Sequence, residues 1–321
     1  GFLMKLGVSA CLIGTQCRYD GIGANDKFVI DVLQKYFQTV PYCPETIIWG
    51  SPREAIRQTL SETGELKIVT STKNPKDVTT ELENVSIECA DKIQNDDLCG
   101  FILKSASPTC GLERVKVYKP FNAPSVKNGV GVFARKIKEK YPYLPVEEEG
   151  RLIDPWLREN FLMQIFAYQD LHNFIKSNPS FNDLVIFHTS YKYLIYSKAQ
   201  KSYTTLGRIV ANKDKKQLDE ILLEYKEEFL KAISLKGNVN KTYNVLLHMF
   251  GYFKKLITKD EKEEILQALN EYKEKIIPLI AVMKIINLYV KRFDVQYLKV
   301  QKFLNPYPKE LSLRSDIKAY K

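Results

Sequence analysis

Three cysteines occupy positions from which their thiolates could act together on a soft ligand. Cys11, Cys43 and Cys110 each follow an apolar segment typical of a buried strand, and Glu45 stands two residues after Cys43. Pro44 lies between them, and proline fixes its own φ and restricts the residue before it. A soft-metal ligand and a general base would then be held at a fixed separation. The same triplet also fits an ordinary strand end with a buried thiol and a solvated carboxylate.

The spacing of these thiols leaves two kinds of metal centre open. Zinc takes four protein ligands in a structural site, or three and a water in a catalytic one. Three thiolates would leave one iron of a [4Fe–4S] cluster without a protein ligand. The separations of 32 and 67 residues match neither zinc-ribbon pairs nor a ferredoxin run. Of the other cysteines, Cys89 and Cys99 are expected to be small buried hydrophobes, and Cys17 lies in the loop after Cys11.

The elements that must position these residues alternate between short strands and helices in the first 150 residues. This order is typical of βαβ units with a mainly parallel sheet, in which ligands bind beyond the carboxyl ends of the strands. We expect Gly50–Arg53 to be a loop that opens a short helix. Strands are predicted at 5–10, up to residue 43, and at 67–70, 99–104 and 115–118, and helices at 26–36, 77–95 and 131–141.

From Asp154 the hydrophobic pattern has a helical period almost to the end of the chain. Breaks interrupt this pattern near residues 178–180, 212–213, 237–238 and 277–278, and we expect seven or eight helices in all. The sequence therefore predicts an α/β domain over residues 1–150 with a mainly parallel sheet, followed by an all-α domain over residues 151–321.

The net charge of +10 is distributed unevenly. Residues 1–150 contain 19 Lys and Arg and 19 Asp and Glu, whereas the rest of the chain contains 29 and 19. The excess suggests that the second half binds a polyanion, although a lysine-rich helical domain without such a partner fits equally well. The sequence shows no apolar run of about 20 residues, and we expect no signal peptide. We expect a cytoplasmic protein with reduced cysteines and no membrane partner.

Five ordered motifs carry a resemblance to the thiouracil desulfidase family, over roughly Met4 to Leu144. That resemblance implies a [4Fe–4S] cluster on Cys11, Cys43 and Cys110, with one iron not ligated by the protein, and a catalytic glutamate and serine that match Glu45 and Ser107. Family members commonly carry Arg where this chain has Ala106, so substrate contacts differ. The motifs are Val8-Ser-Ala-Cys-Leu-Ile-Gly14, Arg18-Tyr-Asp-Gly21, Cys43-Pro-Glu45, Gly50-Ser-Pro-Arg53 and Leu103-Lys-Ser-Ala-Ser-Pro-Thr-Cys-Gly111.

Four further residues are expected to contact the substrate. Ser105 is a second candidate for the serine role, and Lys104 and Arg53 are candidate anchors for an anion or the substrate. Asp20 is a candidate for orienting it. For Lys104, Arg53 and Asp20, a turn cap or a surface ion pair is an equally good interpretation.

The second half of the chain resembles the YbgA-type helical domain that is often fused to this family, in motifs such as Phe187-His-Thr-Ser-Tyr-Lys192 and Tyr203-Thr-Thr-Leu-Gly-Arg208. The fusion resembles desulfidases that act on thiolated uracil, including 4-thiouridine in tRNA. The implied reaction is a non-redox hydrolysis that releases sulfide. Three alternatives stay open: a desulfidase of free 2- or 4-thiouracil or thiouridine only, a non-catalytic metal-bearing RNA-binding protein, and a Cys₃ zinc hydrolase.

Overall fold

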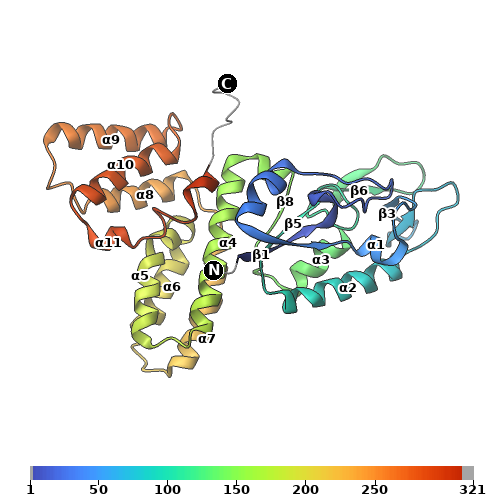
Figure 1. The fold of residues 1–321 in the computed structure, drawn as a ribbon, viewed down its shortest axis with the longest axis horizontal. Coiled ribbons are helices and arrows are strands. Elements are labelled where there is room, and N and C mark those ends of the chain that lie inside the picture. The colour runs from blue at the N-terminus through green and yellow to red at the C-terminus, as the bar shows by residue number, and fades with distance from the viewer. Residues whose placement is uncertain (1–2, 313–321) are drawn as a thin grey trace. The chain divides into compact units, whose positions relative to one another are not determined.

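The computed structural model describes residues 3–312. The chain forms two compact units, Gly1–Ile165 and Phe166–Lys321, and the boundary falls inside helix α4 (Pro155–Lys176). The first unit is α/β and the second consists of helices, as the sequence predicts (Figure 1). The predicted division between residues 150 and 151 stays a prediction.

The sheet that organises the first unit is entirely parallel. Its strand order is β2-β1-β5-β8, and every neighbouring pair is parallel. All six residues of β5 are buried, as expected of a central strand that is covered on both faces. The prediction of a mainly parallel sheet is therefore confirmed. The strands are β1 (Met4–Ser9), β2 (Phe37–Tyr42), β5 (Leu98–Leu103) and β8 (Val146–Glu148).

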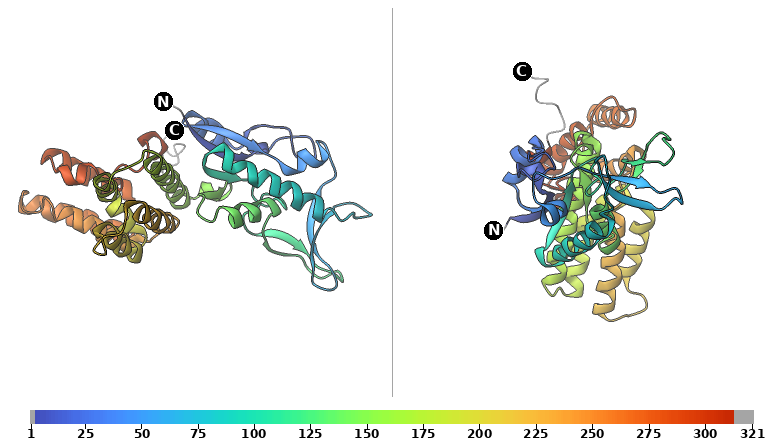
Figure 2. Two further views of the ribbon diagram at one scale, coloured as in Figure 1. Left: turned by 90° about the horizontal axis from the view of Figure 1, so that it is seen from below. Right: turned by 90° about the vertical axis from the view of Figure 1, so that its right-hand side faces the viewer.

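Helices α2 (Thr79–Asp96) and α3 (Val132–Lys140) lie side by side in this unit (Figure 2). Phe101 of β5 meets Phe133 of α3 edge to face, with the ring centroids 5.7 Å apart, and meets Tyr42 of β2 at 5.1 Å. Such aromatic pairs add to the free energy gained by burying their area. This packing fixes the strands whose carboxyl ends carry the cysteines.

A second sheet, which the sequence did not predict, has the strand order β4-β3-β6-β7. Strands β3 and β6 are parallel, whereas the two outer pairs are antiparallel. The prediction of a short helix after Gly50–Arg53 is wrong. Helix α1 (Pro44–Trp49) comes before that loop, with Pro44 in its first turn, and strand β3 follows the loop. The strands are β3 (Ile56–Leu60), β4 (Leu66–Thr70), β6 (Val115–Tyr118) and β7 (Val126–Gly129).

The second unit is built around aromatic side chains. The Phe187 ring stacks on Phe174 with centroids 4.5 Å apart, and Tyr191, Tyr225 and Phe229 pack around it. No helix in residues 3–312 has the length and apolar character needed to cross a bilayer. The helices after α4 are α5 (Phe181–Lys198), α6 (Gln200–Ala211), α7 (Leu218–Ile233), α8 (Val239–Phe250), α9 (Lys259–Lys273), α10 (Leu279–Arg292) and α11 (Gln296–Lys299).

Candidate active site

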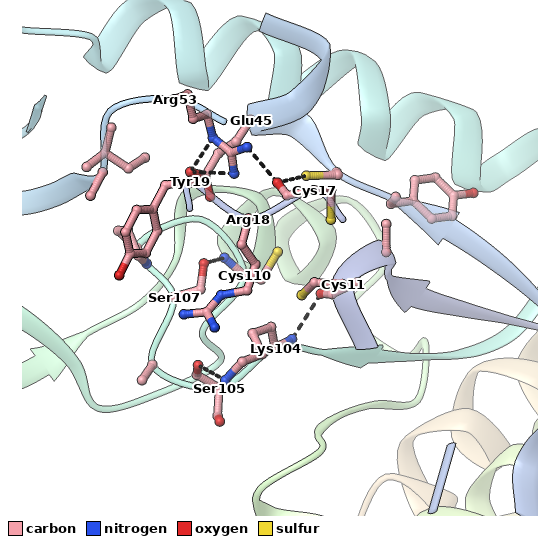
Figure 3. A pocket seen from close by; sticks show the side chains of 18 residues that line it. Cys11, Cys17, Arg18, Tyr19, Glu45, Arg53, Lys104, Ser105, Ser107 and Cys110 are labelled. Atoms are coloured by element: carbon pink, nitrogen blue, oxygen red, sulfur yellow. Dashed lines mark hydrogen bonds and ion pairs between the residues drawn. The ribbon is translucent and has the colours of Figure 1, made fainter. Parts of the chain in front are cut away.

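A cavity of about 250 Å³ lies in the first unit, where the segments that follow β1, β2 and β5 meet (Figure 3). This is the carboxyl edge of the parallel sheet, the place where ligands bind in open α/β folds. The predicted residues that line it are Cys11, Cys43, Cys110, Glu45, Ser107, Ser105, Lys104 and Arg53. Asp20 is not among the lining residues; its carboxylate accepts a hydrogen bond from the Ile22 amide at 3.1 Å and so caps a turn.

The thiols reach the cavity from three separate elements. Cys11 lies in a short 3₁₀ turn, Ala10–Ile13, directly after β1, and Cys43 is the cap residue before α1. Cys110 is in the loop that follows β5. A fourth cysteine, Cys17, also lines the cavity and is buried. Cys17 follows no strand, so the sequence pattern does not place it at the site; the chain returns it there through the turn that begins near Gly14.

The four thiols are free and closely associated. The Cys43 Sγ atom lies 3.0 Å from Thr46 Oγ1 and 4.0 Å from the Cys17 carbonyl oxygen. A hydrogen bond with the Cys11 thiol raises the pKa of Cys17 to about 11, and a hydrogen bond with Cys17, together with burial, raises the pKa of Cys43. Burial also raises the pKa of Cys110. The raised pKa values keep Cys17, Cys43 and Cys110 protonated near neutral pH unless a bound cationic centre displaces their protons.

The chemistry of this donor set suits an iron–sulfur cluster. Such a cluster takes each thiolate on a different iron atom, and here soft sulfur donors line one cavity from three separate elements.

Glu45 is fixed in the cavity wall by Arg53. The Arg53 Nη2 and Nε atoms donate to Glu45 Oε1 at 3.3 and 3.4 Å, and the exposed fractions of the two side chains are 6% for Arg53 and 14% for Glu45. Arg53 Nη1 donates to the carbonyl oxygens of Cys17 at 2.5 Å and Gly50 at 2.9 Å. The guanidinium thus ties the first turn of α1, which carries the carboxylate, to the loop that carries the fourth thiol. Its donors are used inside the protein, which favours a positioning role over the predicted anchoring role.

The two candidate serines are in different hydrogen-bonding states. Ser105 Oγ donates to Glu149 Oε1 at 2.6 Å, and Lys104 Nζ donates to the same oxygen at 3.1 Å. Ser107 Oγ instead accepts from the amides of Thr109 and Cys110, at 3.1 and 3.0 Å. Within residues 3–312 its own hydroxyl proton has no acceptor, so Ser107 can donate to a molecule in the cavity. Ser107 is therefore the better of the two candidates.

The loop that carries Ser107 and Cys110 is held to the second sheet. The fully buried Gln58 of β3 donates through Nε2 to the carbonyl oxygens of Pro108 and Val130, at 3.0 and 2.8 Å. A Cβ atom at Gly131 would approach the Thr109 carbonyl oxygen to 2.5 Å, so only glycine allows this close approach of the two segments. The unpredicted second sheet is thus part of the scaffold of the site.

Arg18 and Tyr19 also line the cavity, although neither was predicted from the sequence as a site residue. In Figure 3 the Arg18 side chain extends into the space between Ser107, Cys110 and Lys104. Its guanidinium lies 5.7 Å from the centre of the Tyr19 ring, and among the described residues it forms no ion pair. The signal for both was their place in the motif Arg18-Tyr-Asp-Gly21.

Comparison with known families divides the chain into two matched regions. The sequence profile of the 2-thiouracil desulfurase family matches residues 6–149, and that of a family of proteins of unknown function, DUF1722, matches residues 192–308. The chain therefore contains one region that matches the 2-thiouracil desulfurase profile and another that matches the DUF1722 profile. Every residue placed in the cavity above lies in the region that matches the desulfurase profile.

Two individual proteins are each similar to about half of this chain. The uncharacterized protein YbgA of Escherichia coli (strain K12) is 27% identical over 157 residues, which is 49% of this chain and 93% of that protein. The solved structure of the [4Fe–4S]-dependent thiouracil desulfidase TudS is 25% identical, and the match covers 47% of this chain and 93% of that one with a TM-score of 0.37. The resemblance predicted from the motifs, a thiouracil desulfidase-like region fused to a YbgA-like region, is confirmed.

Proposed function

We propose that this protein is an iron–sulfur-dependent desulfidase that removes sulfur from thiolated uracil, with 4-thiouridine in tRNA as its substrate. The observation that carries the proposal is the joint presence of free thiols and a carboxylate fixed by an arginine in one cavity of a desulfurase region. The family match supports the chemistry, and the arrangement of the donors supports the cofactor. The products are uridine and sulfide.

Cys11, Cys43 and Cys110 would hold the cluster, because each stands at the carboxyl edge of the sheet and faces the cavity. When bound on three thiolates, a [4Fe–4S] cluster offers one iron as a soft Lewis acid that suits a thiocarbonyl sulfur. Cys17 adds a fourth thiol to the wall of the cavity. The Thr46 hydroxyl, 3.0 Å from Cys43 Sγ, supports that ligand from the second layer.

Glu45 and Ser107 supply the proton chemistry. Glu45 takes a proton from a water molecule, and the water oxygen bonds to the carbon that carries the sulfur. The proton held by Glu45 passes to the sulfur, and the carbon–sulfur bond breaks with its electron pair on the sulfur, which leaves as hydrosulfide. The added hydroxyl gives its proton to Glu45, so the ring keeps a carbonyl. No electron is gained or lost overall. Ser107 donates its hydroxyl proton in a hydrogen bond to the charge that develops on the substrate.

The proposal for tRNA rests on charge and on the two-region architecture. All of the net charge of +10 comes from residues 151–321, and a polyanion is the partner that such a surface attracts. Arg158, one basic residue of that half, has a structural role instead: its guanidinium lies 3.9 Å from the centre of the Phe28 ring and donates to the Leu152 carbonyl oxygen.

The test is sulfide release under anaerobic conditions from thiolated tRNA, 4-thiouridine and 4-thiouracil. We expect release from all three, with the highest kcat/KM for tRNA, and near-complete loss in Glu45→Gln. The exposed Glu54→Gln is the matched control, since Glu54 does not line the cavity. Equal kcat/KM for tRNA and nucleoside would favour the free-base alternative. RNA binding without sulfide from any substrate would favour the non-catalytic alternative.

A further inference from the structure

The outer face of the second sheet carries a row of basic side chains. Along β3 the buried Ile56 and Gln58 face inward and alternate with Arg57 and Thr59, which are partly exposed on the other face. The same alternation exposes Lys116 on β6, between the buried Val115 and Val117. Because β3, β6 and β7 are neighbours in the sheet, Arg57, Lys116 and Lys127 follow one another across three strands. We call these three residues the sheet cations.

The sheet cations lie close enough to one another for their like charges to repel. Lys116 and Lys127 are directly paired across the antiparallel β6–β7 ladder, and like charges in that position are destabilising. Arg57 and Lys116 both lie over the Tyr118 ring, at 4.8 and 4.9 Å from its centre. The ring holds two cations at one place by cation–π attraction, which offsets only part of the repulsion.

No carboxylate neutralises the row. Within residues 3–312, none of the sheet cations forms an ion pair, and Arg57 Nε is buried without a hydrogen-bond partner. Lys67, on the same face of β4, shows the contrast: its Nζ atom lies 3.3 Å from Asp77 and 3.8 Å from Glu65. The charge of Lys67 on β4 is therefore neutralised by carboxylates of the protein. The three sheet cations, on β3, β6 and β7, are left for an external anion.

The row begins one residue along β3 from a residue that lines the active-site cavity. Ala55 and Ile56 line that cavity, and Arg57 is the next residue on the strand. A chain of negative charges lying across the sheet cations could therefore continue toward the cavity. Among polyanions, RNA fits this position best. The proposed substrate of the cavity is a nucleobase, and a nucleobase in RNA is attached to a phosphate backbone.

We propose that Arg57, Lys116 and Lys127, with Tyr118 holding two of them, form the surface on which the desulfurase region binds the phosphate backbone of its RNA substrate. The proposal rests on the proposed function for the identity of the base. It locates backbone contacts in the region of the chain whose formal charges balance, in addition to any contacts made by the basic second unit.

The test uses the full chain and a tRNA transcript without thiolation, so that binding is measured without reaction. We expect the triple variant Arg57→Gln/Lys116→Gln/Lys127→Gln to bind at least about tenfold more weakly at 0.1 M salt. The slope of log affinity against log salt should fall by about 2 to 3, since each phosphate contact contributes about 0.7 to 0.9. The control Lys76→Gln/Lys92→Gln/Lys138→Gln removes three exposed lysines of the same unit and should change the slope by less than 1.

Sulfide release from the 4-thiouridine nucleoside checks the fold of the variants and should be the same in the triple variant as in the wild type. A triple variant that keeps the wild-type affinity and slope, or that loses no more than the control, overturns the proposal. If no preparation releases sulfide from any substrate, the proposed function fails. A selective loss of transcript binding in the triple variant would then still support the surface.

Discussion

The two units bury polar groups for different purposes. In the first unit, the thiols and the Glu45–Arg53 pair are buried at the wall of a cavity, so their remaining hydrogen-bonding capacity faces a ligand. In the second unit, His188 and Gln301 are buried against other protein groups, with His188 Nδ1 3.1 Å from the Tyr225 hydroxyl. A buried polar group indicates chemistry only when it also faces a space that a ligand can enter.

The substitution Glu45→Gln should give the largest loss of kcat for sulfide release. It tests whether the cavity of the first unit is an active site. Glu45→Gln keeps the size of the side chain and removes the base, so kcat for sulfide release should fall by about 10² to 10⁴, the usual contribution of a general base. Glu54→Gln, one residue beyond Arg53 and exposed, should leave kcat unchanged. Full activity of Glu45→Gln would remove the base from the mechanism.

Ser107 and Ser105 should differ in how much each contributes to kcat. Ser107→Ala removes a donor that faces the ligand, and we expect kcat to fall by about a hundredfold, as when one stabilising donor is lost. Ser105→Ala removes a donor that is used on Glu149, and kcat should fall by less than about threefold. Iron content, measured on both variants, shows whether the Cys110 loop still holds the cluster. The reverse order of activities would exchange the roles of the two residues.

His188 provides the corresponding test in the second unit. Burial lowers the pKa of His188 from 6.5 to about 4, so the unfolded chain binds more protons than the folded one between these values. Stability is therefore fully present above pH 6.5 and is lost as the pH falls toward 4. Between pH 7 and pH 5 the loss should be about 2 kcal/mol in urea unfolding of the second unit.

The variant His188→Phe, which does not titrate, should lack this part of the pH dependence. If wild type and variant lose the same stability between pH 7 and pH 5, His188 is not the group responsible. Sulfide release from the nucleoside at pH 7 should be the same in both, because His188 belongs to helix packing in the second unit.

The smallest effect is expected at the start of α5. Ser180 Oγ accepts from the Asp183 amide, and the Asp183 carboxylate accepts from the Ser180 amide, which together form a capping box. Ser180→Ala should cost about 1 kcal/mol of stability and leave nucleoside kcat unchanged. A large loss of nucleoside kcat would show that the two units are not as separate in role as proposed.

Much of the scaffold could be predicted from the sequence because its signals are local. The buried strand β5, the periodic helices α2 and α3, and the four predicted breaks between later helices lie where the pattern placed them, whereas the breaks after α5 and α8 were not predicted. The grouping of Cys11, Cys43 and Cys110 followed from their places at the carboxyl ends of predicted strands. These are consequences of hydrophobic period and of parallel-sheet geometry.

The second sheet and several site residues could not be predicted, because they depend on tertiary contacts that leave no local pattern in the sequence. Strands β3 and β7 are short and rich in polar residues, so their alternation was too weak to identify them. Cys17 and Arg18 reach the cavity through a turn. Arg53 was proposed as a substrate anchor from its charge, and only the structure shows that its donors are used on Glu45 and on backbone carbonyls.

The most direct test of the central claim is an anaerobic count of iron, acid-labile sulfide and zinc, with an absorption spectrum. The proteins to compare are the wild type, Cys43→Ser and Cys99→Ala, since Cys99 is buried in β5 away from the cavity. We predict about four iron and four sulfide per chain in the wild type and in Cys99→Ala, and their loss in Cys43→Ser. Zinc without iron, after anaerobic reconstitution has been attempted, would contradict the account.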